Sequence, residues 1–131
     1  MEQVARQKNE IGKMLERLGN ALITGDLKGI SSCYAFPALF GSDENSRMIA
    51  NAAELELLFA QARNWFISKG IRATRAELQS FEQVSETVAA VDVRWPGFDE
   101  ARNEIHTETS HYIIQTLAGK ASIRVALTRG R

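Results

Sequence analysis

The two histidines are the side chains of this chain best suited to acid–base chemistry, because an imidazole changes charge near neutral pH. His106 and His111 lie five residues apart in a segment that alternates like a β-strand, so we expect them on opposite faces. Ligands on opposite faces cannot chelate one ion, and we predict neither a metal site nor a cofactor. His111 shares its face with Ile105, Ile113 and Leu117, which indicates an inward position. There it is either a half-buried histidine bonded to a neighbour or a candidate catalytic acid, base or donor in a pocket.

Charged side chains accompany these strands. Glu104 and Glu108 flank His106 on its own face, which favours a solvated or subunit-facing row of polar residues. Asp92 and Arg94 share one face of another predicted strand. An acid beside a cation can position a polar substrate or orient a water molecule. The same pair is also typical of an exposed ion pair worth less than about 1 kcal/mol, and both interpretations stay open.

Aromatic side chains with a polar tip are candidates for the wall of an apolar cavity, where each could donate one hydrogen bond. They are Tyr34, Trp65, Trp95 and Tyr112. Taken singly, each of them is more often part of a core or an interface. Cys33 precedes an aromatic residue and has no assignable base, so we predict a small buried hydrophobic residue and not a nucleophile.

Length and charge narrow the classes of function. The chain has 131 residues and a mass of 14.6 kDa, which suits one domain spanning residues 1–131. Sixteen Lys and Arg balance sixteen Asp and Glu, and each side of Gly70 carries eight of each sign. Because no region is dominated by basic residues, we expect no nucleic-acid partner.

A reducing cytoplasm is the predicted location. Cys33 is the only cysteine, so an internal disulfide is excluded. No run approaches the roughly 20 apolar residues that a membrane span needs, and we expect no membrane partner. Charged residues also interrupt every candidate apolar core of an N-terminal secretory signal.

Three helices are predicted in the first half of the chain. The first carries an apolar stripe at helical spacing, made of Val4, Ile11, Leu15, Leu18 and Leu22. Gly25 ends this helix, and Asp26 caps a short second helix that ends near Tyr34. Asn51 caps the third helix, which ends at Gly70. Its predicted buried stripe comprises Leu55, Leu58, Phe59, Ala62, Trp65 and Phe66.

Strands occupy the remainder. A small hairpin is predicted between the second and third helices, and four antiparallel strands follow Gly70, where the period becomes two. The predicted strands are 36–40, 47–49, 71–84 with a bulge or a strong bend near 79–81, 88–95 ended by the Pro96–Asp99 break, 101–117 and 121–127. This order predicts an α+β domain in which a curved antiparallel sheet packs on three N-terminal helices and forms a cone. The interior of the cone is the expected pocket.

The segment from Ala21 to Ile30, ALITGDLKGI, resembles the helix–break–helix that opens many members of the nuclear transport factor 2-like superfamily. Tyr34–Pro37, Trp65–Gly70 and His111–Ile114 fit the same pattern, so the resemblance spans nearly the whole chain. Ketosteroid isomerase, scytalone dehydratase and polyketide cyclases share this fold. The resemblance implies a cone with a small-molecule pocket and a homodimer formed through the sheet face.

The catalytic set of ketosteroid isomerase does not carry over. Its tyrosine position is Leu18 here, its general base falls at Ser42 with Asp43 one residue away, and its second donor is Ser110. The resemblance therefore implies no such isomerase activity, although Asp43 stays a candidate catalytic residue. Leu18 is expected in the pocket wall together with the polar-tipped aromatic residues.

Two functions remain open. The first is a pocket for a small hydrophobic or amphipathic ligand, with or without lyase, isomerase or hydrolase activity. The second is a non-catalytic dimerisation or protein-interaction domain. Apolar residues on both faces of strand 88–95 favour the second function, because a one-sided sheet should be polar outside.

Overall fold

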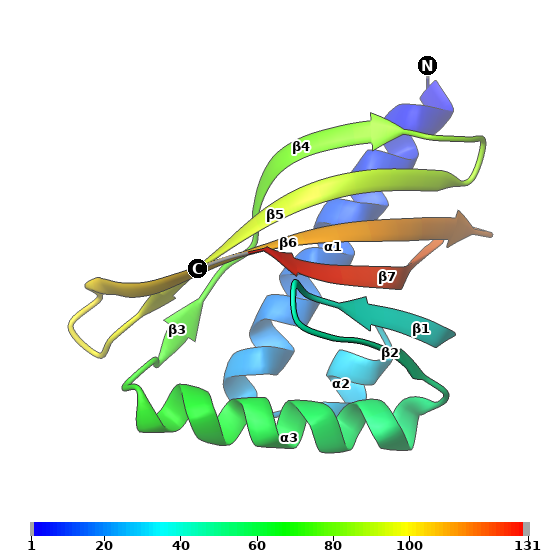
Figure 1. Ribbon diagram of the computed structural model, residues 1–131. Helices are drawn as coiled ribbons and strands as arrows, with labels where there is room; N and C mark the ends of the chain where they lie inside the picture. The colour runs from blue at the N-terminus through cyan, green and yellow to red at the C-terminus, as the bar shows by residue number, and fades with distance from the viewer. Residues whose placement is uncertain (1, 130–131) are drawn as a thin grey trace.

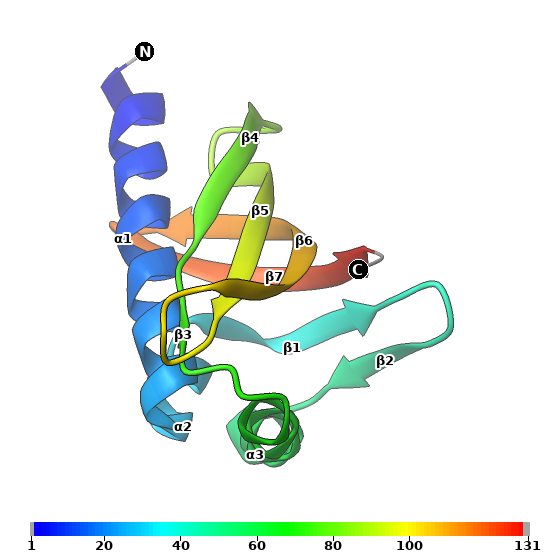
Figure 2. The ribbon, with the colours of Figure 1, turned by 90° about the vertical axis from the view of Figure 1, so that its left-hand side faces the viewer.

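The computed structural model describes residues 2–129, in which a curved seven-stranded sheet wraps around one long helix (Figures 1 and 2). The helices are α1 (Glu2–Thr24), α2 (Leu27–Ser31) and α3 (Ala52–Ser68). The strands are β1 (Tyr34–Gly41), β2 (Ser46–Ile49), β3 (Ala73–Thr74), β4 (Glu77–Gln83), β5 (Val88–Phe98), β6 (Glu104–Leu117) and β7 (Lys120–Arg129). Figure 2 shows α1 along one side of the curved sheet and α3 below it. The predicted helices-plus-curved-sheet architecture is confirmed.

The predicted helix ends are confirmed at the caps. Gly25 has a φ of 76°, a left-handed conformation that glycine adopts without steric cost, and α1 ends beside it. The Asp26 carboxylate accepts the Gly29 backbone N–H at 3.0 Å, and Asn51 Oδ1 accepts that of Glu54 at 3.0 Å. Within residues 2–129, no helix has both the length and the apolar character that crossing a bilayer requires.

The sheet is mixed, which corrects the wholly antiparallel arrangement expected from the sequence. Its strand order is β2-β1-β7-β6-β5-β3, with β4 also paired to β5, and β1 runs parallel to β7. The backbone N–H of Ile123 donates to the Cys33 carbonyl at 2.8 Å and ties the start of β1 to β7. Alternation of side chains is the same in both kinds of pairing, so the residue pattern could not distinguish them.

Strand β5 continues through Pro96 to Phe98, so the predicted break at Pro96–Asp99 is wrong. Strand β4 pairs with β5 only as far as Glu77 opposite Arg94, and β3 pairs with β5 at Gly97 and Phe98. The missing N–H of Pro96 therefore falls where the neighbouring strand is interrupted, and it breaks no ladder there. The predicted strand 71–84 is divided at the same place, and the expected bulge is confirmed as a register shift between Leu78 and Ser80.

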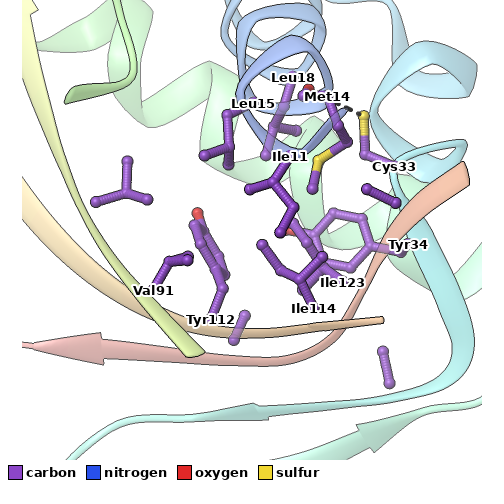
Figure 3. Packing of buried hydrophobic residues seen from close by; sticks show 14 of the residues in the cluster. Ile11, Met14, Leu15, Leu18, Cys33, Tyr34, Val91, Tyr112, Ile114 and Ile123 are labelled. Atoms are coloured by element: carbon purple, nitrogen blue, oxygen red, sulfur yellow. Dashed lines mark hydrogen bonds between the residues drawn. The ribbon is translucent and has the colours of Figure 1, made fainter. Parts of the chain in front are cut away.

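The core lies between α1 and the concave face of the sheet (Figure 3). The stripe of α1 that packs there comprises Ile11, Met14, Leu15 and Leu18, and all four are at most 2% exposed. They meet inward side chains of the central strands, among them Val91, Tyr112, Ile114 and Ile123. Burial of one such side chain stabilises the fold by roughly 1.5–3 kcal/mol, which makes this layer the main source of stability.

Helix α3 is attached more loosely. Of its residues, all of which the structure describes, Leu55 alone is fully buried, and the rest of the predicted stripe is half-exposed. Two polar contacts add to its attachment: Arg63 donates to the Ile23 carbonyl at 2.7 Å, and Ser31 donates to Glu56 at 3.1 Å. The half-exposed face of α3 thus leaves room between the helix and the sheet.

We expect the replacement Leu55→Ala to lower the free energy of unfolding by about 2–5 kcal/mol, because it leaves a cavity in packed surroundings. Leu57→Ala, two residues along the same helix and 69% exposed in the parent, should change it by less than about 0.5 kcal/mol. Urea unfolding followed by circular dichroism measures both. Similar losses for the two variants would contradict the described packing of α3.

Candidate functional site

A cavity of about 110 Å³ lies beyond the packed layer, between the C-terminal half of α1, α3 and the concave face of the sheet. Its wall is mainly aromatic and aliphatic. The aromatic members are Tyr34, Phe40, Phe59, Phe66, Trp95 and Tyr112, and the aliphatic side chains from α1 are Leu18, Leu22 and Ile23. A concave, mostly apolar space with a few polar groups has the character of a small-molecule site.

Three aromatic rings form one side of this cavity. Tyr34 stacks on Phe40 with a centroid distance of 5.4 Å, and Phe59 from α3 lies 6.2 Å from both. Such offset and edge contacts hold the rings in defined orientations. This side of the cavity wall therefore consists of mutually packed apolar rings contributed by β1 and α3.

Trp95 and Tyr112 form the opposite side. The Trp95 Nε1–H donates to the Tyr112 hydroxyl oxygen at 3.0 Å, which leaves the hydroxyl hydrogen available for another acceptor. Gly19 on α1 lies against Trp95, and a Cβ there would be 3.3 Å from the indole ring, tighter than an ordinary van der Waals contact. Burial raises the pKa of Tyr112 to about 12, although contacts with Ser110 and Trp95 lower it, and burial holds the pKa of Tyr34 well above its usual range. Both phenols are thus neutral donors at physiological pH.

The inward face of β6 supplies the polar wall. His106, Glu108, Ser110 and Tyr112 alternate along this strand and all line the cavity. His106 Nε2 is buried and has no hydrogen-bond partner among residues 2–129. It lies 3.9 Å from Glu108 Oε2, too far for a direct hydrogen bond. A donor or acceptor from a ligand is the missing partner that this geometry would accommodate.

Exposure and charge differ along the wall. Leu18 is 1% exposed at the inner end, whereas the Glu108 side chain is 30% exposed and Thr128 is open to solvent. Among the described lining residues, Glu108 is the one carboxylate and no Lys or Arg is present. In the part of the chain that the structure describes, no three side chains are grouped as a metal would require. The cavity is therefore apolar inside and weakly acidic at its polar end.

The expected inward position of His111 is wrong, because its side chain lies on the outer face of the sheet. There its Nδ1 is 2.9 Å from Asp92 Oδ1, and Ser80 donates to the same carboxylate at 2.7 Å. These two hydrogen bonds, with Ser80 the larger cause, hold the pKa of Asp92 below its usual value. His111 is thus a half-buried histidine bonded to a neighbour, the first of the two interpretations open for it.

The predicted alternation of side chains along β6 is present, but the two faces of this strand are similar in hydrophobicity. Ile105, Ile113 and Leu117 on the outer face match Tyr112 and Ile114 on the inner one. Pairing with β5 resolves the ambiguity, since partners across a ladder share a face and the buried Val91 and Val93 lie opposite Tyr112 and Ser110. Sequence reasoning therefore missed His106 and Glu108 as cavity residues, and only the register of this hairpin would have found them.

The other predicted site residues lie in different places. Leu18, Tyr34, Trp95 and Tyr112 line the cavity. Trp65, which was also predicted in the wall, does not line the cavity. Its ring centroid lies 5.2 Å from that of His106, which does line it. Asp43 lies in the exposed turn between β1 and β2, apart from the lining residues, because the hairpin projects away from the cone (Figure 2).

The remaining residues singled out from the sequence have structural partners. Arg94 forms a bidentate ion pair with Glu104, with N–O distances of 2.9 and 3.0 Å, and its Nε also lies 3.2 Å from Glu77 Oε1. The ion-pair interpretation of Arg94 therefore applies, although its partner is not Asp92. Cys33 is 1% exposed, and burial raises its pKa, as expected of a small buried residue.

Comparison with known proteins gives one family and a shared fold. The family model described as NTF2-like protein (DUF6841) matches residues 9–130. No curated protein sequence matches the chain.

Three solved structures have the same arrangement. An NTF-2 like protein of unknown function from Shewanella oneidensis MR-1 has a TM-score of 0.71 at 14% identity, over 94% of this chain and 98% of that one. A domain of unknown function with a cystatin-like fold from Nostoc punctiforme PCC 73102 has a TM-score of 0.76 at 16% identity, over 95% and 77%. An NTF2-like protein with a cystatin-like fold from Novosphingobium aromaticivorans has a TM-score of 0.72 at 11% identity, over 96% and 82%. At these identities the likeness concerns the fold alone.

The two tyrosines of the chain both lie in the cavity wall, which makes their ionisation a direct readout of the site. We expect no phenolate absorbance step near pH 10 in the folded protein, because burial raises both pKa values. The folded state then holds its tyrosine protons more tightly than the unfolded state, so stability should fall as the pH rises above about 10. In urea, both tyrosines should titrate normally. A step near pH 10 with native circular dichroism would contradict the described burial.

Proposed function

The chain belongs to the NTF2-like protein family (DUF6841), and on this premise we propose that its cavity binds a small, largely apolar molecule with one polar group. The observation that carries the proposal is the buried, unpartnered Nε2 of His106 in an otherwise apolar wall. A buried polar atom without a partner costs about 1–3 kcal/mol, and a ligand that bonds to it recovers that cost.

The size of the cavity supports a ligand of about one ring. An engineered cavity of about 150 Å³ in another protein binds benzene, and the cavity of about 110 Å³ here is of the same order. Six aromatic side chains surround it, so an apolar ligand would exchange water for close contacts on several sides. Larger ligands would extend through the more exposed end near Thr128.

Binding, and not a particular reaction, is what these residues support. Leu18 and Ser110, at two of the positions that ketosteroid isomerase uses, line the cavity, but Leu18 has no polar group. Asp43 is exposed in a turn outside it. Neither an assigned base nor a donor pair for an enolate is therefore assembled from those positions.

We expect toluene to raise the melting temperature of the protein. At a concentration ten times its Kd, binding should add about 1.4 kcal/mol to the free energy of unfolding. Ala126→Leu fills the cavity from β7 and should abolish this stabilisation. Ala53→Leu adds the same side chain at an exposed position of α3 outside the cavity wall and serves as the matched control. Thermal-shift measurements and native mass spectrometry test both variants. Absence of stabilisation in the parent, or equal stabilisation in Ala126→Leu, would contradict binding in the cavity.

We propose as a second function that the outer face of the sheet pairs with another copy of the chain. Ala90, Ile113 and Val125 form an apolar row across the three central strands, and Leu127 beside them is 37% exposed. Ile105 on the same face of β6 is 46% exposed. A formal net charge of zero means that no net repulsion opposes association of two copies.

Sedimentation equilibrium at micromolar concentration should therefore give twice the chain mass of 14.6 kDa. Ile113→Lys places a charge in the middle of the apolar row and should shift the protein to monomer without unfolding it. Val84→Lys, at an exposed position, is the control. A parent protein that sediments only as a monomer would contradict the pairing.

A further inference from the structure

We infer that the ligand of the cavity is uncharged and carries a hydroxyl group, whose oxygen lies between His106 Nε2 and Glu108 Oε2. This inference rests on the proposed binding function and adds the chemical class of the ligand. The pair formed by these two side chains is called the His106–Glu108 pair below.

The first argument is the separation of the two atoms. At 3.9 Å, His106 Nε2 and Glu108 Oε2 cannot bond directly, yet a single atom between them can reach both. Hydrogen bonds of about 2.7–2.9 Å to each side would place that atom at the apex of a triangle with a nearly right angle. A hydroxyl suits this place, because it accepts from an Nε2–H and donates to the carboxylate at the same time.

The second argument is the setting of the imidazole. The His106 side chain is 19% exposed, and its Nε2 is buried without a partner in the described chain. The ring meets Trp65 edge to face, with the two centroids 5.2 Å apart. This contact limits rotation of the imidazole, so the unpartnered atom is held at the cavity wall.

The third argument is charge. No Lys or Arg is among the described residues of the wall, so a carboxylate or phosphate ligand would meet Glu108 without a compensating cation. The inference places the ring proton of His106 on Nε2, and an ammonium group would then have no lone pair with which to accept it. Transfer of an ammonium group into an aromatic cavity also costs hydration. An alcohol or phenol avoids both penalties.

Matched one-ring probes test this class by isothermal titration calorimetry at pH 7. Toluene carries no polar group, phenol a hydroxyl, benzoate a negative charge and benzylamine a positive charge. We expect phenol to bind about tenfold or more tightly than toluene, as one hydrogen bond to a charged group predicts, and benzoate to bind more weakly than either. Tighter binding of benzoate or benzylamine than of phenol would overturn the inference.

Variants of the His106–Glu108 pair locate the hydroxyl. His106→Phe and Glu108→Met keep the approximate shape of the side chain and should reduce the preference for phenol over toluene to within about twofold. His111→Phe changes the outer histidine of the same strand and should keep the full preference. If the preference survives in His106→Phe, the hydroxyl binds elsewhere and the inference is wrong.

The outcomes separate this inference from the proposed function. Equal affinities for phenol and toluene in the parent protein would mean that a bound water already bridges the pair, or that the pair takes no part. Either result overturns the hydroxyl assignment while binding of an apolar molecule stands. Failure of every probe to bind, together with an unchanged melting temperature, would overturn both.

Discussion

Packing of the α1 stripe against the concave face of the sheet is the constraint on which the other features depend. Leu15 and Ile11 meet Val91 and Ile114 in a layer closed to solvent. The sheet curves to cover the helix. Along this curve β5 pairs with β4 at one end and with β3 at the other. Beyond Leu18 the helix no longer fills the concave face, and the cavity begins there.

One strand serves both the core and the cavity. Along the inward face of β6, Ile114 and Tyr112 belong to the packed layer, whereas Glu108 and His106 face the open end. The polar groups therefore sit on a regular ladder with neighbours on both sides, and not on a loop. Such a support fixes their separation more firmly than a turn like that around Asp43 would.

Local signals in the sequence predicted much of the fold, and long-range pairing accounts for what they missed. Gly25 and Asn51 act through neighbours within four residues, so the helix ends were readable. The face on which His111 lies depends on which residue of β5 pairs with it. That residue, Asp92, is about twenty positions away along the chain. The parallel contact of β1 with β7 is more distant still, and alternation carries no information about it.

The two walls of the cavity differ in stiffness. The sheet wall is held by continuous ladders and by the α1 layer, whereas α3 is anchored by one fully buried side chain, two hydrogen bonds and an exposed ion pair between Glu54 and Arg47. Displacement of α3 would consequently cost less than any distortion of β6. Phe59 and Phe66 belong to the less firmly held wall, and His106 and Glu108 to the firmly held one. Tolerance of ligand size is therefore expected at the aromatic side of the cavity, and strict selection of the polar group at β6.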